Sequence, residues 1–197
     1  LHPDVAVHPD APVTTPYDMM LNQWVETARG TARHGSCGLG FGETLERHER
    51  GGDVTVSARV CGDPDEMRKR LEAIRTHYAP MRARELGVEA DLALLDDPRI
   101  AKRFIGDAEH FARCVRLVST REGIGGADLV FEGAQGLELD MRLGPFPHVT
   151  RSRTGLTNVS ALLRAAGRSR LDVIHVTRAY RTRHGAGPLA DEVATCP

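Results

Sequence analysis

The stretch Leu129-Val-Phe-Glu-Gly-Ala-Gln-Gly136 carries the pattern around which the rest of the chain is best interpreted. Its first three residues are apolar and predict a short buried strand. Gly133 then predicts a tight turn, because glycine allows backbone conformations and close contacts that a Cβ would block. Gln135 follows, and its amide offers an acceptor and two donors in one plane, which suits the edge of a nucleobase. The turn is therefore a candidate ligand site at a strand end, with an ordinary solvated turn as the alternative.

Regular elements along the chain predict an α/β fold. Amphipathic patterns indicate a helix over residues 17–33, and Asp-Pro pairs at 63–64 and 97–98 mark the starts of two more, ending near Leu86 and Leu117. A fourth helix is expected over 159–166. Apolar or alternating runs predict strands at 54–60, 129–131 and 171–177. We therefore expect residues 1–197 to form a single α/β domain with a mostly parallel sheet flanked by helices.

Composition excludes several classes of protein. The formal net charge of -1 gives no electrostatic reason to expect nucleic acid or an anionic membrane as a partner. The four cysteines form no C-x-x-C pair, which argues against a zinc ribbon and for reduced thiols in a cytoplasmic protein. No apolar run approaches the length of a transmembrane helix. Trp24 is expected to anchor the core, with a base-stacking platform as the less favoured interpretation.

Three segments resemble signatures of the adenylosuccinate synthetase family, in the family's order. Phe131–Gly136, together with several later residues, is similar to a Phe-Glu-Gly-Ala-Gln-Gly signature that continues to a Val-Thr pair; the later residues are Leu139, Asp140, Gly144, Pro147, Val149 and Thr150. Arg178–Pro188 is similar to the family's Lys-Ala-Tyr-x-Thr-Arg-Val-Gly-x-Gly-Pro. More loosely, Gly35–Gly42 stands where the family has Gly-Thr-Thr-Gly-Arg-Gly-Ile-Gly. The resemblance runs from about Val13 to Pro188.

This resemblance implies a ligase of purine biosynthesis. Such enzymes join L-aspartate to C6 of IMP, using GTP and Mg²⁺, through a 6-phosphoryl intermediate. The implied fold is a P-loop-NTPase-like ligase core, and the implied assembly is a cytoplasmic homodimer. No residue of this chain is assigned to the metal. A guanine nucleotide, GMP or dGMP with ATP or dATP as the phosphate donor, is the alternative substrate, as in phage-type relatives.

The resemblance also implies roles for individual residues. Gln135 is the expected catalytic contact to the activated purine oxygen, and Thr150 the expected contact to the 5′-phosphate. Arg50 is the nearest match to an arginine that reaches across the dimer to the phosphate, with Arg47 as the fallback. Two further groups of residues are expected to bind the nucleotide, the first near its phosphate and the second near its ribose: Ser36, Cys37 and Gly38; Arg183, His184 and Gly185.

Departures from the family pattern bear on substrate and activity. Cys37 stands in place of a hydroxyl, His184 in place of valine, and Arg151-Ser-Arg153 in place of Ser-Ser-Asn, which adds positive charge beside Thr150. The 197 residues contain no Gly-Asp-Glu-Gly-Lys-Gly-Lys loop and no aspartate-binding loop of the family type. We therefore expect this chain to be the central part of a longer ligase and not to turn over substrate alone. A non-catalytic nucleotide-binding or dimerisation module is the alternative.

Overall fold

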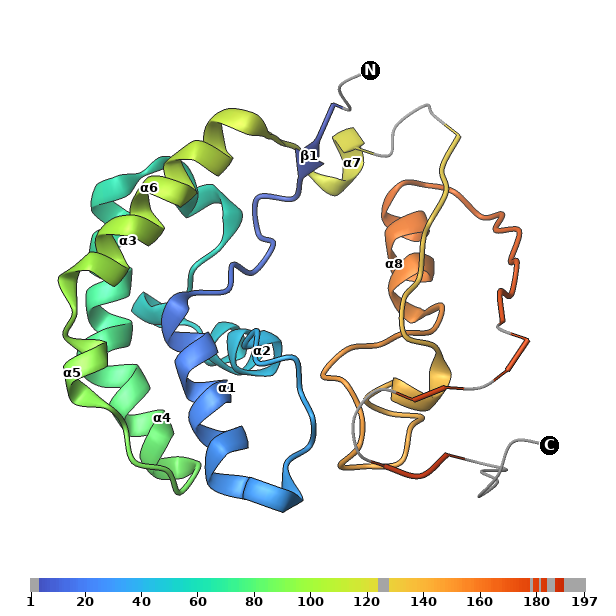
Figure 1. Cartoon of the computed structure of the whole chain (residues 1–197). Coiled ribbons are helices and arrows are strands. Elements are labelled where there is room, and N and C mark those ends of the chain that lie inside the picture. Colours follow the sequence, from blue (N-terminus) through green and yellow to red (C-terminus); the bar gives the residue numbers. More distant parts are fainter. Residues whose placement is uncertain (1–3, 124–127, 178, 181, 184–186, 190–197) are drawn as a thin grey trace.

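Helices are the main regular structure in the computed structural model, which describes residues 4–123, 128–177, 179–180, 182–183 and 187–189 (Figure 1). The α-helices are α1 (Pro16–Arg29), α2 (Phe41–Arg50), α3 (Pro64–Ala73), α4 (Ala79–Glu85), α5 (Leu92–Leu95), α6 (Pro98–Cys114), α7 (Thr120–Gly123) and α8 (Thr157–Ala165). A π-helical turn, Ile74–Tyr78, joins α3 to α4. Short 3₁₀ turns span Gly30–Ala32, Gly52–Val54, Ala58–Gly62 and Leu137–Leu139. No helix in these ranges is long and apolar enough to cross a bilayer.

The predicted helix starts are confirmed by their caps. The carboxylate of Asp63 accepts the Glu66 N–H at 3.0 Å and precedes Pro64 in the first turn of α3. The carboxylate of Asp97 accepts the Arg99 N–H at 2.9 Å at the start of α6. These side chains bond to amides that have no partner inside a helix, and proline fits where its missing N–H costs nothing. Within the predicted range 17–33, α1 ends at Arg29, and the glycine of that range, Gly30 with φ 54°, is its C-cap.

The core lies between α1, the 3₁₀ turn Ala58–Gly62, and the helices from α3 to α6. Its buried side chains include Leu21, Val56, Met67, Leu71 and Ile74. Trp24 is partly buried against this cluster, as expected for a core anchor. The apolar stripes predicted from helical periodicity therefore do face one another.

A buried ion pair joins α1 to α2. The guanidinium of Arg47 donates to both carboxylate oxygens of Asp18 at 2.8 Å, and to the carbonyl oxygens of Val13 and Val54. Both charged side chains are fully buried. A planar guanidinium can satisfy this many acceptors at once, which is what allows the charge to be buried. Arg47 is therefore structural, and its expected fallback role across a dimer interface is wrong.

The predicted sheet is much smaller than expected. Its described part is one parallel pair, β1 (Ala6–Val7) with β2 (Arg116–Leu117), in which Ala6 lies opposite Arg116. Residues 54–60 form 3₁₀ turns and one isolated bridge, and residues 129–131 and 171–177 are extended without strand partners. Val130 is 96% exposed, and Ile174 is 86% exposed. The three strand predictions are wrong for this chain, because an apolar run becomes a strand only when a neighbour satisfies its backbone groups.

Candidate functional site

The predicted turn and Thr150 belong to one hydrogen-bonded loop, residues 135–155, here called the signature loop. Its two arms run alongside each other. The Thr150 N–H donates to the Leu139 carbonyl at 2.9 Å, and the Met141 N–H donates to the Ser152 carbonyl at 2.9 Å. The Thr154 hydroxyl donates to the Gly136 carbonyl at 2.6 Å. These bonds fix Thr150 in the same local unit as the turn that carries Gln135.

Asp140 holds the two arms of the signature loop together. Its carboxylate accepts the N–H groups of Arg142 at 2.8 Å and Thr154 at 2.7 Å, and also that of Leu143. The Arg142 N–H lowers the pKa of Asp140 most, burial opposes it, and the Thr154 N–H lowers it further. The matched aspartate of the signature is therefore an organising residue of this loop, with its side chain turned inward and 4% exposed.

The turn itself differs in detail from the prediction. Gly133 has open space where a Cβ would stand, so it is not required by packing. The left-handed backbone falls on Gln135 (φ 72°) and Gly136 (φ 76°). A glutamine in that region is uncommon, and such strained residues concentrate at functional sites. The Gln135 side chain is exposed. Gly144 does need to be glycine, because a Cβ there would lie 2.7 Å from Val149 Cγ1.

Amides at the start of the glycine-rich loop Gly35–Gly42 bind an anion, and this anion is a side-chain carboxylate of the same chain. The carboxylate of Glu26, on α1, accepts the N–H groups of His34, Gly35 at 2.9 Å and Ser36 at 3.1 Å. Burial raises the pKa of Glu26, and these amides together with Arg29 lower it, with a net downward shift. Asn22 binds the Ser36 hydroxyl at 3.2 Å. Ser36 is therefore committed to α1.

Cys37 and Gly38 remain available in the same loop. Their N–H groups form no hydrogen bond with any part of the chain that the structure describes. The Cys37 thiol is free and exposed. Gly40, two positions on, is fixed against α1, since a Cβ would lie 2.7 Å from the Met19 amide nitrogen. The arrangement leaves two adjacent amides that can take a ligand oxygen at the tip of a rigidly held loop.

His148 is the point at which the three matched segments meet. Its ring packs edge-on against that of His34, with centroids 6.0 Å apart, and its carbonyl accepts a hydrogen bond from Arg183. Gly187 approaches it closely, since a Cβ would stand 2.6 Å from His148 Cβ. Arg183 thus lies at the signature loop, and its expected contact with the ribose stays a prediction. The other two predicted ribose contacts, His184 and Gly185, lie outside the described residues.

Arg50 is engaged within its own chain. It forms ion pairs with Glu46 at 2.9 Å and with Glu85 at 2.6 Å, and lies 5.7 Å from the ring centre of Tyr78. The hydrogen bonds from Arg50 and then Arg82 lower the pKa of Glu85 to about 2. A role across a dimer interface would require Arg50 to leave these partners.

Sequence reasoning did not identify Glu26 or His148. Glu26 is a charged residue on the polar side of an amphipathic helix, which is usually solvated. His148 occupies a variable position between two matched residues, Pro147 and Val149. Their contacts join residues from 8 to 114 positions apart (148 − 34 for His148 and His34), so no local pattern could have identified them.

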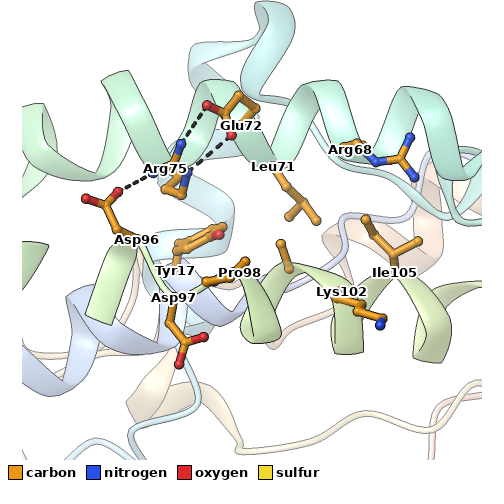
Figure 2. A pocket seen from close by; sticks show the side chains of 11 residues that line it. Tyr17, Arg68, Leu71, Glu72, Arg75, Asp96, Asp97, Pro98, Lys102 and Ile105 are labelled. Atoms are coloured by element: carbon orange, nitrogen blue, oxygen red, sulfur yellow. Dashed lines mark hydrogen bonds and ion pairs between the residues drawn. The ribbon is translucent and has the colours of Figure 1, made fainter. Parts of the chain in front are cut away.

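The best-defined hollow lies away from these residues. It has a volume of about 360 Å³ and lies between α1, α3, the π-helical turn and α6 (Figure 2). Figure 2 shows Tyr17 beside Arg75, which bonds to Glu72 and Asp96. Neither Gln135 nor Thr150 lines it. Among the described side chains, no group of three or more His, Cys, Asp or Glu residues is placed to hold a metal ion.

Comparison with known proteins agrees with the matched segments. The family model for adenylosuccinate synthetase matches residues 2–195. The chain belongs to the adenylosuccinate synthetase family. Adenylosuccinate synthetases of Neisseria meningitidis serogroup C and Synechococcus sp. strain CC9902 are each 30% identical to it, over 95% and 93% of the chain. The organellar chromatophore adenylosuccinate synthetase of Paulinella chromatophora is 33% identical over 93%. The chain spans 41–43% of the length of these three relatives.

Proposed function

We propose that this chain is the purine nucleotide-binding core of an adenylosuccinate synthetase-like ligase that joins L-aspartate to C6 of IMP. The observation that supports this most is the signature loop. Hydrogen bonds hold the Thr150 backbone and the turn of Gln135 in one loop, which supports placing the proposed base contact and the proposed phosphate contact on the same unit. Family membership adds that the fold belongs to a ligase of purine biosynthesis.

In the proposed site, each residue has a defined task. The Gln135 amide donates a hydrogen bond to the purine 6-oxygen and stabilises the charge that develops there. Thr150 binds the 5′-phosphate, and the Cys37 and Gly38 amides bind an oxygen of the same nucleotide. GTP phosphorylates the purine 6-oxygen and so makes it a leaving group. The aspartate amine then displaces the phosphorylated oxygen from C6. Among the described residues, no group of three or more His, Cys, Asp or Glu side chains is placed to hold Mg²⁺.

Thermal-shift and calorimetric titration with IMP, GMP and dGMP test the proposal. We expect one of them to bind, and Gln135→Ala to weaken its binding about tenfold, the loss typical of one hydrogen bond to a charged or polarised group. The control is Asn158→Ala, which removes an exposed amide on α8, outside the signature loop, and should leave affinity unchanged. Equal binding by the Gln135→Ala variant would contradict the site assignment.

The same nucleotides also distinguish the two candidate substrates and test whether the chain is catalytically active. Preference for GMP or dGMP over IMP would identify the alternative substrate, together with ATP or dATP as donor. With the preferred nucleotide, its phosphate donor and L-aspartate, we expect the 197-residue chain to bind without forming product. Clear product formation would contradict that expectation.

A further inference from the structure

The two arginines that follow Thr150 have different surroundings. Arg151 forms ion pairs with two carboxylates of α2, Glu46 and Glu49, the second at 2.6 Å. Its side chain is 32% exposed, and that of Glu46 is 20% exposed. Burial lowers the pKa of Arg151 and the two carboxylates raise it, with a net upward shift. Arg151 therefore ties the end of the signature loop to α2, more than 100 positions earlier in the chain.

Arg153 has a fixed backbone and an uncommitted side chain. On one side, the Ser152 carbonyl accepts the Met141 N–H; on the other, the Thr154 N–H donates to Asp140. Arg153 as a residue is partly exposed, and its guanidinium forms no ion pair or hydrogen bond with the residues that the structure describes. Hydrogen bonds of the neighbouring residues therefore hold the Arg153 backbone in the signature loop, and none of these bonds uses the charge of its side chain.

Arg151 and Arg153 differ in whether their charge is already paired with carboxylates. The charge of Arg151 faces two carboxylates, so its forked donor groups are already occupied and an incoming phosphate would have to displace them. Arg153 retains its whole donor set, and a guanidinium is well suited to bidentate binding of phosphate oxygens. It is also three positions from Thr150, the proposed phosphate contact.

We propose that Arg153 binds the phosphate of the nucleotide, and that Arg151 positions the loop for it by anchoring Thr150–Thr154 to α2. This inference rests on the proposed nucleotide site and adds a phosphate-recognition residue to it. It also explains why, of two arginines only two positions apart, Arg151 is paired with two carboxylates and Arg153 has no partner among the described residues.

Binding measurements separate the phosphate contact from the anchor. Arg153→Gln is expected to weaken binding of the preferred nucleoside monophosphate roughly tenfold to a hundredfold, and to leave binding of the matching nucleoside unchanged. Arg103→Gln, a change at an arginine that is 87% exposed on α6, is the control and should affect neither ligand. Equal loss for nucleotide and nucleoside, or no loss, would overturn the role of Arg153.

Hydrogen exchange of the Met141 and Thr150 amides tests the anchor without any ligand. Arg151→Gln and the double variant Glu46→Gln/Glu49→Gln are expected to speed exchange of these amides alike, Arg151→Lys to restore part of the protection, and Arg153→Gln to change nothing. Unchanged exchange in Arg151→Gln would overturn the anchor. If the unaltered chain binds no nucleotide, the proposed function fails and the Arg153 role with it, while the exchange result still decides the Arg151 role.

Discussion

Asp140 shows how one side chain can set the geometry of a site that it does not need to touch. Its carboxylate accepts N–H groups from both arms of the signature loop and so holds together the two arms that carry Gln135 and Thr150. The resemblance marks this position but gives it no role; the hydrogen bonds supply one. An aspartate is suited to it because an ionised carboxylate accepts several N–H bonds at once.

The pH dependence of the loop follows from Asp140. Its pKa is lowered in the folded loop, so its contribution is fully present above the unfolded value of about 3.9 and is lost as the pH falls through the lower folded value. We expect the Arg142 and Thr154 amide resonances to shift with a midpoint below pH 3.9, and Asp140→Asn to abolish that step. A midpoint at or above the ordinary value would contradict the assignment.

At the scale of elements, the close contact between α1 and the start of α2 depends on Gly40. The residue has φ 77°, and a Cβ would lie 2.6–2.8 Å from backbone atoms of Asp18 and Met19. Gly40→Ala should therefore lower the free energy of unfolding by about 1–3 kcal/mol, as expected for overpacking. Gly42→Ala is the matched control, because nothing lies within 4 Å and alanine favours a helix. Urea unfolding of the two variants measures the difference; equal stability would show that α1 can move aside.

The same scale shows which elements the sequence could specify. The starts of α3 and α6 were predictable because Asp63-Pro64 and Asp97-Pro98 act on amides within three residues of themselves. Whether residues 171–177 form a strand was not predictable, because a strand needs a partner strand that a sequence pattern does not identify. The resemblance marked the position of Asp140, but its role was not predictable, because it also bonds Thr154, which lies 14 positions away. The contacts of His148 were not predictable either, because they join segments that are distant in the sequence.

For the whole molecule, the important feature is the apolar surface of the unpaired extended segments. Val130, Ile174 and Val176 are 96%, 86% and 91% exposed. Exposed apolar residues of high β-propensity promote association through unpaired edges. We expect the triple variant Val130→Thr/Ile174→Thr/Val176→Thr to reduce self-association in sedimentation velocity, with a change in unfolding free energy within about 0.5 kcal/mol. Val56→Thr, at a fully buried site, is the contrasting control and should be clearly destabilised. Unaltered association of the triple variant would show that these segments do not mediate contact.

The contact between Glu26 and the glycine-rich loop has a thermodynamic consequence for any ligand. Two of the loop's amides, together with that of His34 just before the loop, are satisfied by a carboxylate on a neighbouring helix, so the backbone is ordered before anything binds. A ligand oxygen that reaches Cys37 and Gly38 would not have to immobilise a flexible chain, and would avoid most of the roughly 1–2 kcal/mol per residue that such ordering takes. Binding at this loop would then carry only a small penalty in conformational entropy, because the loop backbone is already in place.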